Sequence, residues 1–579
     1  MNERSSVNAR RLDGIPLAIE LAAARVKALS VEQIAVRLDD RFRLLTGSGR
    51  GALPHHQTLR AALDWSYNLL TEPERTLLRR LAVFAGGFSL DAAEAVCVGS
   101  DLDVAQVLDL LTRLVDKSLV LFEEHNGEGR YLLLETVRQY ALDRLLEAGE
   151  HDARRSRQRD FYLAWAEARR TIIEDAESGV DTQTSAFDME HDNLRAALQW
   201  SWTRHDLSIT LQLAGALAPF WNRRDHFSEG RHWLEVSLAG GDEETPPFLR
   251  ARVQYYAGVL AWHQGDNQQA IAHLEGGLAL FRALGAQGWI SASLNFLAIL
   301  VYRQGAYPRA ETLLEESLSL TRQAGKLGEL AFPIELLGIV ARLRGDYDRA
   351  DALGTEALEL SRQVGDWRRE RTAVDALGLV ARNRGDFERA EALCAEGLAL
   401  ARGFKDRFGI TASLNSLALI ACDRGDWARA RDLADEALTL ARETGQKAVV
   451  ARALNILGRV AHHEGNSARA LALHREGLTL FRELGEPLGI AQSLERLCLV
   501  AASRERYEAA ARLLAAATAL RDRMGSSMPP IDRPEFDRTF SLIRGAFEEN
   551  RFTVVWAEAT AAPEEAVSMA LAGPMLALG

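Results

Sequence analysis

The hydrophobic and polar positions of this chain repeat every forty residues over about half of its 579 residues. Glycines follow this period from Gly265 to Gly465 and again from Gly285 to Gly525, where Lys405 takes the place of one glycine. Alanines keep the same step at Ala270, Ala310, Ala350, Ala390, Ala430, Ala470 and Ala510. Leucines keep it at Leu280, Leu320, Leu360, Leu400, Leu440, Leu480 and Leu520. Several series in one register indicate an array of repeated structural units.

Each unit predicts a pair of amphipathic helices joined by a tight turn. In one unit, Gly345 breaks the chain, Tyr347 begins the second helix and Gly365 ends it, since glycine tolerates the left-handed conformation of a helix end. Ala350 is small where the two helices cross. We count seven such pairs over residues 249–525, with weaker pairs back to about residue 160.

Residues 51–150 lack this period and predict a winged helix. The apolar spacing predicts helices near residues 57–70, 73–84, 89–98 and 103–117. Alternating residues over 118–123 and 130–134 then predict two short strands around the turn Asn126-Gly127-Glu128-Gly129. The predicted fold is therefore mainly all-α. A helical segment is predicted for residues 1–50 and a winged helix for residues 51–150. Degenerate helical pairs follow over residues 151–248, an α-solenoid of repeats over 249–525 and a helical cap over 526–579.

The repeated unit resembles the tetratricopeptide repeat. Leu337-Gly338, Gly345, Tyr347, Ala350 and Ala357 hold the spacing of that family's consensus. The period of forty departs from the usual length of about 34 residues. The resemblance implies a solenoid whose first helices line a concave surface that binds another molecule.

Two columns of residues recur on the predicted first helices. The first column is polar throughout: Asn295, Glu335, Asp375, Asn415, Asn455 and Glu495. The second lies two turns later: Tyr302, Arg342, Arg382, Cys422 and His462. The resemblance places both columns in the concave groove, where their polar members would hydrogen-bond a protein or peptide ligand. The alternative is that these side chains only face water or bond their neighbours.

The chain before the repeats resembles another family. Gly14, Pro16 and the Leu-Ala pair after it are similar to the Gly-x-Pro-Leu-Ala motif of NB-ARC-type STAND ATPases. Residues 81–88, 114–120, 134–140 and 190–198 resemble segments of bacterial LuxR-type and SARP-associated regulators in the same order. The resemblance implies that residues 1–50 are a remnant of the helical subdomain behind the nucleotide. It also implies that the winged helix is a regulatory wedge.

The phosphate-binding loop of those ATPases, GxxxxGK[ST], is missing. The resemblance places the nucleotide-binding core before Gly14, where this chain has thirteen residues. We therefore expect no cofactor and no ATP hydrolysis by the chain alone. Two explanations stay open: a truncation, or a separate nucleotide-binding partner chain that makes an ATPase only in combination.

Charge bears on nucleic-acid binding. The chain carries a formal net charge of −12, and residues 55–150 hold nine basic and sixteen acidic residues. A surface that repels phosphates does not favour DNA, so we expect no direct DNA binding by this winged helix. We therefore expect a regulatory scaffold in signalling or transcriptional regulation, whose repeats bind a protein, a peptide or a small inducer. A DNA-binding LuxR-type transcriptional regulator remains the alternative.

No motif for catalysis or metal binding is found, so we expect a protein that is not an enzyme. The four cysteines are far apart and predict apolar filler rather than disulfides or a zinc site: Cys97, Cys394, Cys422 and Cys498. No apolar stretch reaches the roughly 18 residues of a membrane span, and no signal segment opens the chain. We expect a cytoplasmic protein.

Overall fold

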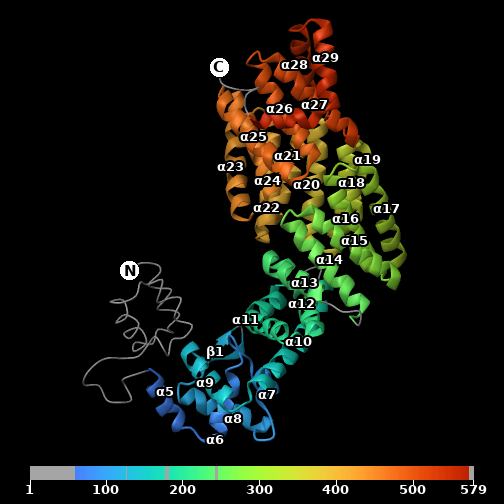
Figure 1. Cartoon of the computed structure of the whole chain (residues 1–579). Helices are drawn as coiled ribbons and strands as arrows, with labels where there is room; N and C mark the ends of the chain where they lie inside the picture. Colours follow the sequence, from blue (N-terminus) through green and yellow to red (C-terminus); the bar gives the residue numbers. More distant parts are fainter. Residues whose placement is uncertain (1–58, 126, 176–180, 241–244, 573–579) are drawn as a thin grey trace, which may run out of the picture. The chain divides into compact units, whose positions relative to one another are not determined.

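The computed structural model describes residues 59–125, 127–175, 181–240 and 245–572 (Figure 1). The predicted helical remnant over residues 1–50, with Gly14 and Pro16, lies outside them. The chain divides into two compact units. The first unit holds the chain up to Arg224 and the short segment Ala239–Glu243. The second unit holds Asp225–Leu238 and the chain from Glu244 onward.

The first unit begins with a winged helix. Its helices are α5 (Leu59–Asn68), α6 (Glu72–Leu81), α7 (Leu90–Cys97), α8 (Val104–Asp116) and α9 (Glu135–Glu147). Strands β1 (Leu121–His125) and β2 (Glu128–Leu132) pair antiparallel, with Phe122 opposite Tyr131. The four predicted helices and both strands are confirmed. The prediction that Glu128 and Gly129 belong to the turn is wrong, because both residues pair in β2.

Local capping explains where these helices begin. Ser89 accepts a hydrogen bond from the amide of Ala92 at the start of α7. Asp103 and Gln106 form a reciprocal capping box at the start of α8. The backbone of Phe88 bonds to that of Tyr131 in both directions at 2.9 Å, which holds the hairpin against the helices.

Long helices complete the first unit: α10 (His151–Asp175), α11 (Asp181–Thr203) and α12 (Leu207–Arg223). Helix α10 packs against both of the others. Phe187 stacks on Phe220 with ring centroids 5.3 Å apart, and both rings are fully buried. The expected helices between residue 160 and the regular repeats are thus present, and α13 (Phe227–Gly240) follows.

The second unit contains the seven predicted helix pairs (Figure 1). The first helices are α14 (Pro247–His263), α16 (Gln287–Arg303), α18 (Leu327–Arg344), α20 (Trp367–Arg384), α22 (Arg407–Asp423), α24 (Lys447–His463) and α26 (Pro487–Ala502). The second helices are α15 (Asn267–Leu284), α17 (Tyr307–Ala324), α19 (Tyr347–Val364), α21 (Phe387–Gly403), α23 (Trp427–Glu443), α25 (Ser467–Leu484) and α27 (Tyr507–Met524). Three helices follow: α28 (Arg533–Gly545), α29 (Glu549–Ala561) and α30 (Pro563–Ala572).

The turns of the repeats have the predicted backbone. Gly345 takes φ of +90° and Gly365 takes +75°, a region that suits glycine. Lys405, which interrupts the glycine series, keeps the same left-handed turn with φ of +56°. An acid or amide caps the second helix in five repeats: Asp266, Asp346, Asp386, Asp426 and Asn466.

The solenoid of the second unit winds far enough for its sixth and seventh repeats to touch its first three. Asn267 Nδ2 donates to the carbonyl of Leu484 at 2.8 Å, across 217 positions of sequence. Ser526 Oγ, just after the seventh repeat, donates to the carbonyl of Leu343 at 3.0 Å. These contacts join successive turns of the superhelix, which sequence periodicity alone does not predict.

One packing position in the first helices differs from repeat to repeat. A Cβ at Gly458 would lie 2.5 Å from the ring of His474, whereas a Cβ at Gly338 would meet Leu353 at 3.4 Å, an ordinary contact. His474 is buried, and its Nδ1 lies 3.0 Å from Asn455 Oδ1, so the ring has little freedom to move away.

We expect Gly458→Ala to lower the free energy of unfolding by about 2 kcal/mol, because the new methyl overlaps the His474 ring. The matched change Gly338→Ala replaces a poor helix former by a good one, and its new methyl overlaps no neighbouring atom. It should raise that free energy by about 0.5 to 1 kcal/mol. Chemical denaturation followed by circular dichroism measures both. Equal effects of the two variants would show that the His474 contact does not limit this position.

Candidate functional site

The first predicted column lies inside the wall of the solenoid. Asn295, Glu335, Asp375, Asn415 and Glu495 are buried, and Asn455 is half-buried. We call the side of the first helices that carries this column and the second one the inner face. Burial of so many polar side chains requires partners, since an unpaired buried polar group costs free energy.

Most of these partners belong to the next repeat. Thr372 Oγ1 donates to Glu335 Oε2 at 2.7 Å, and Ser413 Oγ donates to Asp375 Oδ2 at 2.8 Å. Asn455 Nδ2 donates to Ser493 Oγ at 2.9 Å. Asn415 Nδ2 donates to the carbonyl of Val449, and Glu495 pairs with Arg521 of its own repeat. The geometry therefore favours a bonding role between neighbours for these five, and ligand binding by the column stays a prediction.

The column still holds unused hydrogen-bonding capacity. The Oδ1 atoms of Asn295, Asp375 and Asn415 are buried and have no hydrogen-bond partner among the described residues. Burial raises the pKa of Asp375 to about 6, although Arg371 lies 3.1 Å away. A carboxyl group with this pKa changes its charge near neutral pH.

The second column carries an unpaired cation. Arg342 is half-buried, and its buried Nε atom has no hydrogen-bond partner within the described part of the chain. Burial lowers the pKa of Arg342, and the neighbouring ionisable groups are tyrosines and Arg382, not carboxylates. His462 has a lowered pKa for the same reason, and Tyr302 is half-buried near Arg342.

Arg382 belongs to a larger group, which we call the arginine cluster: Arg382, Arg459 and Arg496 with Asp423 and Asp532. Arg382 and Arg459 contact the two oxygens of Asp423 at 2.5 and 2.8 Å. Asp532 lies 2.8 Å from Arg496 and 3.6 Å from Arg382. Burial alone would raise the pKa of both aspartates, but the surrounding guanidinium groups hold it below its usual value.

Four members of the cluster were missed in the sequence, and a signal existed for one of them. Arg459 lies one helical turn after Asn455 and one turn before His462, so it shares their face. The other repeats have an apolar residue at its position: Val259, Ile299, Ile339, Leu379, Leu419 and Leu499. Asp532 follows the last repeat, where the period gives no expectation.

In the first unit, residues 81–88 and residues 190–198, two of the segments that resemble bacterial regulators, meet in a buried group of hydrogen bonds. Glu190 Oε1 accepts from Arg130 Nη1 at 2.6 Å, and its Oε2 accepts from Tyr162 and Asn193 at 2.8 Å. Asn193 also donates to the carbonyl of Gly87 and accepts from the amide of Ala85. We call Arg130, Tyr162, Glu190 and Asn193 the joint. It fixes the hairpin and the residue 85–88 turn of the winged helix to α10 and α11.

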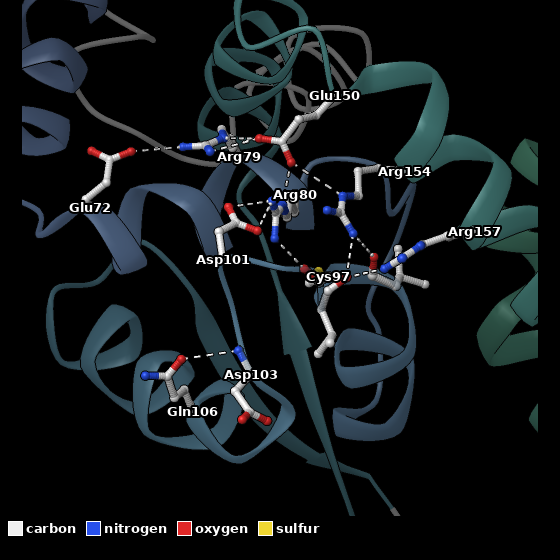
Figure 2. Close-up of polar contacts among 12 residues, drawn as sticks. Glu72, Arg79, Arg80, Cys97, Asp101, Asp103, Gln106, Glu150, Arg154 and Arg157 are labelled. Carbon is white, nitrogen blue, oxygen red and sulfur yellow. Dashed lines mark hydrogen bonds and ion pairs between the residues drawn. The ribbon is translucent and has the colours of Figure 1, made fainter.

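A second polar cluster fixes α10 to the winged helix (Figure 2). Arg80 contacts Glu150 at 2.5 Å and Asp101 at 2.7 Å, while Arg79 contacts Glu150 at 2.8 Å. Arg154 donates to the carbonyl of Val98 at 2.7 Å. The side chains of Arg80 and Arg154 are buried, so these cations stabilise the unit and are not placed to contact phosphates.

The exposed face of α8 carries apolar and acidic residues, with Arg113 as an exposed cation in its last turn. Val104 and Leu108 are exposed by 48% and 47%, and Asp109 is exposed beside them. Lys117, near the end of α8, contacts Glu74 at 2.7 Å. Reading of a DNA groove needs donors and cations on this helix. The absence of direct DNA binding by this domain stays a prediction.

Chemistry of other kinds was sought in the same residues. The four cysteines are all buried and unpaired, as the filler prediction requires. Within the described ranges, no group of three or more His, Cys, Asp and Glu side chains is placed to hold a metal ion. No helix in the described part of the chain has both the length and the apolar character to cross a bilayer.

Comparison with protein families identifies both domain types. The tetratricopeptide repeat profile matches residues 249–323 and 409–483, and a winged helix-turn-helix domain profile matches residues 70–146. The chain thus contains tetratricopeptide repeats and a winged helix-turn-helix domain.

Relatives in Mycobacterium tuberculosis match parts of the chain. A protein named "Putative HTH-type transcriptional regulator" is 52% identical over 229 residues, which are 40% of this chain and 26% of that protein. A protein named "Uncharacterized protein" is 54% identical over 145 residues, which are 25% of this chain and 37% of that protein. The chain spans about a quarter of the length of the first of these relatives and a little over a third of the second.

Solved structures with similar helical arrangements are distant in sequence. A Pyrococcus horikoshii STAND protein with a tetratricopeptide repeat sensor is 14% identical, with a TM-score of 0.41, and the match covers 80% of this chain and 72% of that one. A Rap protein in complex with competence and sporulation factor is 15% identical with the same TM-score, and the match covers 58% and 98%.

Proposed function

We propose that this chain is a non-catalytic regulatory protein that recognises a peptide or protein segment on the inner face of its repeats. The observation that carries the proposal is Arg342, a half-buried cation without a hydrogen-bond or ion-pair partner among the described residues. A partly buried guanidinium group whose Nε atom is buried without a partner favours binding of an anionic group. An extended peptide supplies such a group together with backbone donors for the unpaired Oδ1 atoms of the first column.

We further propose that the chain acts in signalling or transcriptional regulation, as part of an NB-ARC/STAND or LuxR-type regulator. The resemblance of the Gly14–Pro16 motif and the name of the relative in Mycobacterium tuberculosis support this proposal. In it the winged helix is a regulatory wedge, and any ATPase activity requires a nucleotide-binding domain that belongs either to a longer form of this chain or to a separate partner chain.

Panning a random heptapeptide phage library against the full chain tests peptide recognition. We expect enriched peptides with at least one acidic residue. Arg342→Gln should weaken their binding about tenfold, since one charge-assisted contact of about 1.4 kcal/mol is lost. The matched variant Arg322→Gln removes an exposed arginine outside the inner face and should leave the dissociation constant unchanged.

Isothermal titration calorimetry with synthetic copies of the enriched peptides gives these dissociation constants. Absence of any enriched peptide, together with retention of duplex DNA at physiological salt, would contradict the proposal and favour the DNA-binding alternative. Equal weakening by both arginine variants would contradict the assignment of the site to Arg342.

A further inference from the structure

Residues 526–532, which follow the last repeat, lie against the first helices of earlier repeats. Ser526 Oγ donates to the carbonyl of Leu343, and the side chain of Ser527 approaches Gly345. Asp532 reaches Arg382 of the fourth repeat and Arg496 of the seventh. The segment therefore connects the seventh repeat with the third and fourth repeats, which lie far from it in sequence.

Asp532 occupies an unusual position for these contacts. It is the N-cap residue of α28, where an aspartate ordinarily accepts a hydrogen bond from an amide of the first turn. Its side chain makes no such bond. The carboxylate instead turns to the arginine cluster, where 12% of its side chain is exposed. The contacts with the two arginines replace the cap.

The arginine cluster has an excess of positive charge without this aspartate. Asp423 is shared between Arg382 and Arg459, whose side chains are 6% and 13% exposed. Among the described residues, the acidic partners of Arg496 lie on or beside α28, namely Asp532 and the exposed Glu535. Removal of Asp532 would leave three buried guanidinium groups with one buried carboxylate. Such a site favours a replacement carboxylate.

We propose that Arg382 and Arg496 form a carboxylate-binding site of the inner face, and that Asp532 fills it as an internal stand-in for a peptide ligand. The inference rests on the proposed function, because it names the anchor for the peptide. The ligand class is a peptide with one carboxylate, from an acidic side chain or from its free C-terminus. Binding of that carboxylate displaces residues 526–532, so the ligand changes the position of the C-terminal helices.

Arg342 extends this site. Both Arg342 and Arg382 lie close enough to Tyr347 to influence its pKa, and so do Arg521 and Arg533. Arg521 is already paired with Glu495, whereas no described carboxylate forms an ion pair with Arg342, whose main charged and ionisable neighbours are tyrosines and Arg382. A displacing ligand that also reaches Arg342 gains a contact that the internal segment does not make. This difference gives an external peptide an advantage over the tethered segment.

The segment itself supplies the probe. A fluorescent, acetylated and amidated heptapeptide with the sequence of residues 526–532 is titrated with the full chain, and fluorescence polarisation gives the dissociation constant. We expect Asp532→Asn to bind this peptide at least about tenfold more tightly than the unchanged chain, because internal competition is weakened. Asp537→Asn, an equal charge change at an exposed position of α28, should bind like the unchanged chain.

Peptide variants identify the carboxylate. A peptide ending in asparagine amide should lose the gain in affinity, and a peptide ending in asparagine with a free C-terminus shows whether a terminal carboxylate replaces the side chain. Arg382→Gln in the Asp532→Asn background should abolish the gain. If Asp532→Asn does not fold, hydrogen exchange at Ser526 of the unchanged chain, whose amide donates to the carbonyl of Arg521 at 2.9 Å, should rise on addition of excess peptide.

The outcomes separate this inference from the proposed function. Equal binding by the unchanged chain and by Asp532→Asn would overturn the stand-in role of Asp532 and leave peptide recognition intact. No binding of the heptapeptide, with retained binding of phage-selected peptides, would do the same. No binding of either kind of peptide would overturn both.

Discussion

Replacement of Asp423 by asparagine is expected to lower the free energy of unfolding of the repeat unit by about 3 to 5 kcal/mol. The side chain is 5% exposed and bonds to Arg382 and Arg459 with separate oxygens. The substitution keeps the shape but removes the charge that compensates two buried cations. We also expect weaker peptide binding, because Arg382, a member of the proposed carboxylate-binding site, loses the contact with Asp423 that holds its side chain in place.

A second substitution makes this prediction specific. Arg459 occupies a position that is leucine in the repeats of Leu379 and Leu419. Arg459→Leu in the Asp423→Asn background removes the cation whose ion pair with Asp423 is lost, whereas Arg382 keeps Asp532, so the double variant should recover part of the lost stability. The energies of single and double variants form a cycle that isolates the interaction.

Scanning calorimetry on the full chain measures these changes as shifts of the transition of the repeat unit. Asp348→Asn is the control, since Asp348 pairs with Arg384 at a fully exposed position and should leave the transition unchanged. A double variant less stable than Asp423→Asn alone would contradict the charge argument and indicate that Arg459 stabilises the unit by packing.

The repeats were predictable because each unit presents the same physical problem. A small residue at Ala350, a left-handed turn at Gly345 and a helix end at Gly365 are local requirements, so they leave a period in the sequence. The winged helix was predictable for a similar reason, because amphipathic spacing and capping residues such as Ser89 and Asp103 are local. The bounds of both strands shifted by two or three residues, and Glu128 and Gly129 pair in β2 instead of forming the turn.

The candidate site was less predictable because its chemistry depends on contacts distant in sequence. The columns of Asn455 and Arg342 were found, but nothing in the repeat period shows that Asn455 bonds to Ser493 or that Arg342 has no partner. The superhelix brings Asp532 to Arg382 across 150 positions, and only the winding of the whole unit determines that contact. The sequence therefore predicts which face of the helix carries these side chains, but not which residues pair with them.

The joint of the first unit gives the other large expected effect. Glu190 accepts hydrogen bonds from Arg130, Tyr162 and Asn193, and its side chain is 7% exposed. Glu190→Ala leaves Arg130 buried without its carboxylate and Tyr162 without its acceptor. We expect the free energy of unfolding of the first unit to fall by about 3 to 5 kcal/mol.

The mechanism of this loss is detachment of the winged helix from α11, not a change within either element. The Ala85 amide, which donates to Asn193 Oδ1 at 2.9 Å, should then exchange its hydrogen faster, and hydrogen-exchange mass spectrometry of the residue 85–88 turn measures this. Glu135→Ala removes a local, partly exposed pair with Arg138 and should not change that exchange. Slow exchange at Ala85 in Glu190→Ala would show that the apolar contacts of Phe84 and Phe88 hold the winged helix in place without the joint.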